Sequence, residues 1–175
     1  MNIRIEEKNT FDKALKTGIS LFLGAGFSVF AEDKHGEKLP CGNELLEELK
    51  EKFPKIAAFH DLSKVSTVLE KSMEKEKFKG YLTDRFTVNN YGMEYDNLTK
   101  VNVKNIFSTN IDDLIFKIWD NAEQSQRYVN NTLNLGESND RLAINYFPVH
   151  GCVLNPEKDY IFSNIKIASA YSSQD

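Results

Sequence analysis

The chain has 175 residues, enough for one domain with a substantial core, of which 41% are hydrophobic and 27% charged. Its formal charge of -4, from 22 Lys and Arg against 26 Asp and Glu, lacks the basic excess of a nucleic-acid binder. No apolar run reaches the length of about 20 residues that spans a bilayer, and residues 1–8 contain no signal-peptide core, so we expect a cytoplasmic protein.

Glycines divide the N-terminal part of the chain. Hydrophobic spacing over residues 9–18 predicts a short helix that ends at Gly18. The apolar run 19–23 follows and predicts a buried strand. Residues 29–42 are polar and contain two glycines and a proline, so we expect a loop that can fold over a ligand.

Helical spacing dominates the middle of the chain. Residues 43–53 predict an amphipathic helix that is capped by Asn43 and buries one apolar face. Apolar residues recur at helical spacing over 61–86, where we expect two or three short helices with breaks near Ser72 and Gly80. No residue pattern in this helical region predicts a catalytic or binding site.

Two further strands are predicted in the C-terminal half. Residues 105–109 form the first, and the sequence turns helical at once from Asp112. Residues 143–149 form the second, with Pro148 at its end because proline cannot donate to a strand ladder. Strands separated by helices favour an α/β fold with a parallel, Rossmann-like sheet, in which ligands gather at the carboxyl ends of the strands.

The first predicted strand ends in the turn Gly24-Ala25-Gly26-Phe27-Ser28. Glycines one residue apart allow positive φ and lack the Cβ that would keep a pyrophosphate at a distance. Turn amides can then face the anion, while Ser28 caps the next helix or bonds a phosphate oxygen. The pattern predicts a phosphate-binding turn, and an ordinary glycine turn after a core strand is the alternative.

This turn does not fit the dehydrogenase fingerprint. The sixth position of a G-x-G-x-x-G run is Val29 rather than glycine. About 20 residues further on, where a strand should present a ribose-binding acid, residues 43–50 have helical spacing. A hydride-transfer enzyme is therefore disfavoured.

Polar groups follow all three predicted strands. Asn110 and Asp112 come after the second strand, and His150 comes after the third. Because the carboxyl ends of parallel strands share one edge of the sheet, these residues and the glycine turn converge on one crevice. The alternatives are that Asn110 or Asp112 only caps a helix, and that His150 is a core histidine bonded to backbone.

Three segments, 24–28, 108–112 and 149–151, resemble in this order the signature motifs of the sirtuin (SIR2-like) superfamily. The spacing is most similar to that of bacterial SIR2-like domains that hydrolyse NAD in anti-phage defence. The resemblance implies that residues 1–175 are the N-terminal portion of an NAD-binding domain, with a helical insertion at about 55–100. We therefore expect a truncation of a longer effector.

The resemblance also implies roles for individual residues. Asp112 would bond the nicotinamide carboxamide, and Asn110 would hold the ribose hydroxyls or the attacking water. His150 would orient the ribose and act as general base, since an ordinary imidazole accepts a proton near neutral pH. The residues expected to contact NAD are Gly24, Ala25, Gly26, Phe27, Ser28, Thr109, Asn110 and Asp112. Of these, Gly24, Ala25, Gly26 and Ser28 would hold the diphosphate. From its position in the turn, Phe27 is expected to close over the ribose.

Departures from the deacylases of the superfamily bear on the activity. Their four-cysteine zinc module cannot form here, because the chain has only Cys41 and Cys152 and no C-x-x-C pair. Residues 30–35 also replace the Gly-Ile-Pro-x-Phe-Arg segment of the deacylases. These departures favour hydrolysis of NAD to nicotinamide and ADP-ribose without a metal.

Two other functions stay open at this point. One is an NAD-dependent deacylase or ADP-ribosyltransferase with a different acceptor, and the other is a non-catalytic nucleotide-binding or oligomerisation module. From the defence branch we also expect a homo-oligomer or an associated sensor domain as partner, with no membrane and no direct nucleic-acid contact.

Overall fold

The computed structural model describes residues 7–123, 125–158, 160 and 162. Four parallel strands form one sheet in the order β1-β2-β4-β3. The strands are β1 (Ile19–Leu23), β2 (Val103–Ser108), β3 (Tyr128–Asn131) and β4 (Ala143–Pro148). The predicted α/β class with a parallel, Rossmann-like sheet is therefore confirmed, and β3 is a strand that the sequence did not predict.

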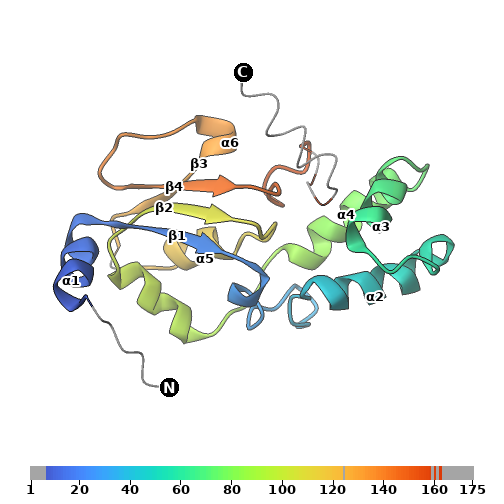
Figure 1. Cartoon of the computed structure of the whole chain (residues 1–175), viewed down its shortest axis with the longest axis horizontal. Helices are drawn as coiled ribbons and strands as arrows, with labels where there is room; N and C mark the ends of the chain where they lie inside the picture. Colours follow the sequence, from blue (N-terminus) through green and yellow to red (C-terminus); the bar gives the residue numbers. More distant parts are fainter. Residues whose placement is uncertain (1–6, 124, 159, 161, 163–175) are drawn as a thin grey trace.

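Helix α5 packs against one face of the sheet, α6 lies beside β3, and α1 lies at the end of the sheet where β1 begins (Figure 1). The arrowheads of β2 and β4 point toward α4, and α2, α3 and α4 lie together beyond them. None of the helices in the described ranges combines the length and apolar character needed to cross a membrane. The helices are α1 (Lys8–Thr17), η1 (Ala25–Phe27), α2 (Gly42–Lys52), η2 (Pro54–Ile56), α3 (Leu62–Glu70), α4 (Lys75–Phe86), η3 (Met93–Lys100), α5 (Leu114–Asp120) and α6 (Thr132–Leu135).

Two hydrophobic cores hold these layers. In the first, Ile106 and Ile144 of the sheet pack with α5 and with Tyr95 of η3. The second core lies among α2, α3 and α4, and it also contains Ile111 and Val153 from the segments that follow β2 and β4. Because these two side chains come from segments that directly follow strands of the sheet, their burial in the second core holds the helices against the carboxyl edge of the sheet.

One face of the sheet carries an exposed aromatic row. Phe22, Phe107 and Phe147 stand in register on β1, β2 and β4, and the rings of Phe107 and Phe147 stack with their centroids 4.6 Å apart. Phe22 is 72% exposed. The prediction that β1 is a buried strand is therefore wrong, because α5 and η3 pack only against the opposite face and β1 is an edge strand.

The helical region follows the predicted spacing with two corrections. The break near Ser72 is confirmed, but Gly80 lies inside α4, where a single exposed glycine is tolerated. Asn43 is not the cap of α2, because the helix begins one residue earlier. Its N-cap is Cys41, whose amide donates to the Glu44 carboxylate at 2.8 Å.

Alanine substitutions at Gly18 and Gly80 should change the free energy of unfolding in opposite directions. Gly18 ends α1 at φ 104°, and a Cβ there would lie 2.6 Å from the side chain of Lys104. Gly18→Ala should therefore lower the free energy of unfolding by about 1–3 kcal/mol. Gly80→Ala should raise it by about 0.5–1 kcal/mol, because α4 has open space at this position. Urea titration of both variants checks the pair, and equal signs would contradict it.

Candidate functional site

A cavity of about 90 Å³ lies where the segments after β1 and β2 meet the helical layer. Ser28, Thr109, Asn110 and Asp112 supply its polar wall. Its apolar walls come from the loop before α2, from the helices and from the C-terminal part of the chain, through Leu39, Pro40, Leu45, Leu62, Phe86 and Phe162. The cavity thus lies at the carboxyl edge of the sheet, where Leu45 of α2, Leu62 of α3 and Phe86 of α4 complete its lining.

Asn110 joins the first two predicted motifs. Its Nδ2 donates to the Gly24 carbonyl at 3.1 Å and to the Ser28 hydroxyl oxygen at 2.9 Å. Nothing among the described residues donates to its Oδ1, and the side chain borders the cavity. Asn110 can therefore accept a hydrogen bond from a ligand hydroxyl or a water, but it has no amide proton left to donate.

Ser28 extends this network to Asp112. The Ser28 hydroxyl accepts from Asn110 and bonds the Asp112 carboxylate. All three side chains are at most 9% exposed. The resulting Asn110–Ser28–Asp112 network is buried and directional, which is the kind of arrangement that fixes polar atoms at a binding surface.

The glycine turn differs from the predicted phosphate-binding geometry. Neither Gly24 nor Gly26 has positive φ, Gly24 being extended at φ -124°. The following segment is a three-residue 3-10 turn rather than the start of an α-helix, and the amide of Phe27 donates to the Gly24 carbonyl at 2.8 Å. The conformational argument for these glycines is therefore wrong, and only the open space at Gly26 favours close approach of a ligand.

The residues around the turn are placed unequally. Ala25 lines the cavity, whereas Phe27 packs edge-to-face on Tyr95 with centroids 5.3 Å apart. The Tyr95 hydroxyl also donates to the Phe27 carbonyl. Phe27 is thus held by η3 and does not line the cavity.

The Asp112 carboxylate both caps the start of α5 and lines the cavity. Its Oδ1 accepts the Leu114 amide at 3.1 Å, which satisfies a donor at the start of α5. The helix begins at Leu114, two residues later than predicted, and the same carboxylate also borders the cavity. Burial raises the pKa of Asp112 to about 6, partly offset by the bonds from Ser28 and the Leu114 amide.

This shift predicts how stability depends on pH. Because the folded-state pKa of about 6 exceeds the ordinary 3.8, the folded chain keeps the Asp112 proton after the unfolded chain has lost it. The contribution to stability is complete below pH 3.8 and is lost as the pH rises through 6, about 3 kcal/mol in all. Asp112→Asn should remove this fall when unfolding free energies are compared at acidic and neutral pH. A fall as steep as the parent's would contradict it, and exposed Asp96→Asn is the control.

His150 lies beside the network but not in the wall of the cavity. Its imidazole donates to the Thr109 carbonyl and faces the Phe162 ring at 6.4 Å between centroids. Burial lowers its pKa, and the Thr109 bond partly offsets the change. The alternative of a core histidine is supported in part, because the ring bonds the backbone. His150 is, however, only half-buried, and its partner Thr109 directly precedes Asn110.

The cavity walls could not be read from the motifs alone. Leu62 and Phe86 lie on α3 and α4, in the region predicted to carry no chemistry, and Leu39 and Pro40 come from the predicted loop. At about 90 Å³ the cavity is smaller than the roughly 300–1,000 Å³ of typical ligand pockets. It can hold one ring-sized group, and a larger ligand would extend beyond it.

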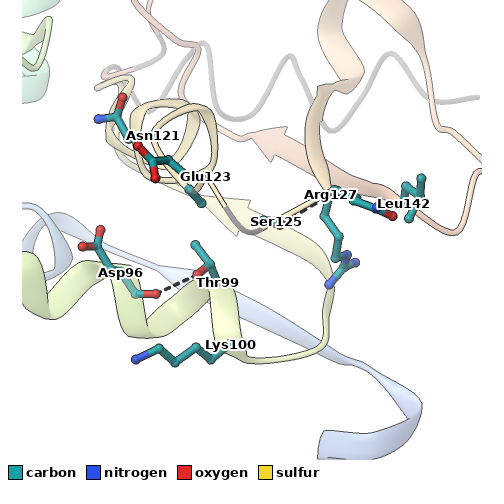
Figure 2. A pocket seen from close by; sticks show the side chains of 10 residues that line it. Asp96, Thr99, Lys100, Asn121, Glu123, Ser125, Arg127 and Leu142 are labelled. Carbon is teal, nitrogen blue, oxygen red and sulfur yellow. Dashed lines mark hydrogen bonds between the residues drawn. The ribbon is translucent and has the colours of Figure 1, made fainter.

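A roomier hollow of about 730 Å³ lies away from this site (Figure 2). Asp96, Thr99 and Lys100 of η3 form one wall, with Asn121 and Arg127 across from them. It adjoins the amino ends of the strands, since Arg127 donates to the Val103 carbonyl. Ligands of parallel sheets gather at the carboxyl ends, so we assign the site to the smaller cavity.

Comparison with protein-family models and with curated proteins finds no match to this chain. Within the described residues, no group of three His, Cys, Asp or Glu side chains is placed to bind a metal ion.

Proposed function

We propose that the chain binds NAD⁺ at the carboxyl edge of its sheet and hydrolyses the bond between nicotinamide and ribose. The observation that carries the proposal is the Asn110–Ser28–Asp112 network, in which groups from two strand ends meet beside a ring-sized cavity. The motif resemblance to SIR2-like domains supplies the identity of the nucleotide. The proposal includes the role that the resemblance implies, an effector of anti-phage defence that depletes NAD⁺ as a homo-oligomer or with a sensor domain.

The hydrolysis of NAD⁺ needs little general-acid catalysis from the protein. NAD⁺ and water give nicotinamide, ADP-ribose and a proton, and positive charge builds on the anomeric carbon while nicotinamide leaves neutral. The site therefore has to fix the ribose, hold the carboxamide and position one water. Asn110 Oδ1 can accept from a ribose hydroxyl or that water, and the Asp112 carboxyl can bond the carboxamide.

His150 is proposed to take the proton. Its lowered pKa keeps the imidazole neutral at physiological pH, as a base requires. One ring nitrogen donates to the Thr109 carbonyl, which leaves the other as an acceptor. Because His150 does not line the cavity, the reacting ribose would have to lie outside the cavity, beside Thr109 and within reach of the His150 imidazole.

A pH profile tests this assignment. Since the pKa of His150 is lowered below its ordinary 6.5, kcat/KM should be flat through neutral pH and decline only on acidification below 6.5. Nicotinamide release measured across this range checks the prediction. A decline with its midpoint above 6.5 would contradict the neutral base.

The decisive experiment follows NAD⁺ with water as the only acceptor, with an acylated peptide added in a parallel arm. Nicotinamide and ADP-ribose in equal amounts without peptide support the hydrolase, and peptide-dependent release supports the deacylase or ADP-ribosyltransferase alternative.

The small cavity and the position of His150 favour a second candidate, a nucleotide-binding module without turnover. Calorimetry with NAD⁺ and ADP-ribose distinguishes it, because this candidate binds without converting the nucleotide.

A further inference from the structure

Arg85 gathers contacts from three separate parts of the chain. From its place near the end of α4, its Nε and Nη2 donate to the two oxygens of Glu48 on α2, at 3.1 and 3.0 Å. Its Nη1 donates to Asp33 at 3.2 Å, and Nη2 also donates to the Lys38 carbonyl at 2.6 Å. One guanidinium thus connects α4, α2 and the loop over residues 29–42.

The partners of Arg85 are themselves fixed. Asp33 is 1% exposed, and its carboxylate also accepts the amides of His35 and Glu37 at 2.8 and 3.1 Å. Tyr81, one helical turn before Arg85, donates its hydroxyl to Glu48. The bidentate, partly buried Arg85–Glu48 pair and the single contact to the buried Asp33 carboxylate together define one geometry, which a flexible ammonium group cannot reproduce.

Each element held by Arg85 supplies a wall of the cavity. Phe86 is its neighbour on α4, Leu45 lies one helical turn before Glu48 on α2, and Leu39 follows the carbonyl that Arg85 binds. The spacing of the apolar walls therefore depends on a side chain that does not line the cavity itself.

We propose that Arg85 is a positioning residue that sets the width of the cavity and so the affinity of the site for the ring of its nucleotide. This inference rests on the proposed function for the identity of the ligand, NAD⁺. Arg85 acts through the loop and helix α2, so it should govern how well the ring is held and not the bond-breaking step.

The test compares Arg85→Met with Asp84→Asn. Asp84 joins the same helix to the same loop through Lys34 at 2.9 Å, but both of these side chains are at least half exposed. A double variant, Arg85→Met with Asp33→Asn, avoids leaving a buried unpaired carboxylate if the single variant fails to fold. Arg85→Lys keeps the charge and loses the bidentate contact.

Hydrogen exchange without ligand and steady-state kinetics with NAD⁺ are the two readouts. In the Arg85→Met and double variants, exchange at the Leu39 amide, which donates to the Ala31 carbonyl, should accelerate at least about tenfold. KM should rise about tenfold while kcat stays within about threefold. Asp84→Asn should match the parent, and Arg85→Lys should fall between.

Unchanged exchange and unchanged KM in a folded Arg85 variant would overturn the inference, as would equal effects from Asp84→Asn. If the parent itself releases no nicotinamide, the proposed function fails instead. Hydrogen exchange then still tests how Arg85 holds the loop, and the dissociation constant for NAD⁺, measured by calorimetry, replaces KM.

Discussion

Replacing Asn110 by alanine is expected to lower nicotinamide release from NAD⁺ at least about 100-fold in the full protein. The change removes the Oδ1 acceptor at the cavity and also both Nδ2 bonds, to Gly24 and Ser28. The Ser28 hydroxyl, which is 4% exposed, then loses its donor, so the Asp112 carboxyl loses the support that orients it. The loss of a buried bond should cost about 1–3 kcal/mol of stability, which the fold is expected to survive.

Asn105→Ala is the matched control for this prediction. Asn105 lies on β2, the strand that precedes Asn110, but faces the exposed side of the sheet, where its Nδ2 donates to the Ser20 hydroxyl at 3.1 Å. This variant should release nicotinamide at the parental rate. If the Asn110→Ala variant released nicotinamide as fast as the parent, the Asn110–Ser28–Asp112 network would have no part in the reaction.

Replacing His150 by alanine is expected to lower turnover by about 100-fold or more, the usual loss for a general base. Because the imidazole does not line the cavity, the dissociation constant for ADP-ribose should change by no more than about threefold. The two effects are measured by single-turnover kinetics and by calorimetry. Together they separate a chemical role from a binding role.

His60→Ala serves as the control, since His60 is exposed between η2 and α3 and does not line the cavity. If His150→Ala weakens ADP-ribose binding as much as it slows turnover, His150 acts by holding the ligand. If His150→Ala changes neither turnover nor ADP-ribose binding, His150 has only a structural role, through its hydrogen bond to the Thr109 carbonyl.

Strand ends were the predictable part of this molecule. Strand β1 ends directly before Gly24, and β2 and β4 end shortly before Asn110 and His150. Hydrophobic periodicity therefore located the ends of these three strands. Strand β3 was missed because it has four residues, two of them asparagines. Its Asn130 is held by Asn145 at 2.8 Å, a tertiary contact that local propensity cannot report.

The walls of the site depend on contacts between distant residues. Arg85 lies 37 residues from Glu48 and 52 from Asp33, and each of the three reads alone as an exposed charge on a helix or loop. The exposure of Phe22 was equally hidden, because which face of an edge strand is covered depends on where α5 packs. Likewise, glycine spacing alone could not distinguish the extended Gly24 from a residue with positive φ.

A nuclear magnetic resonance titration of the parent with ADP-ribose tests the central claim most directly. The account predicts that the amide signals of residues 24–28, 109–112 and 150–151 shift together with one dissociation constant. Shifts confined to the hollow around Arg127, or no shifts at all, would contradict it.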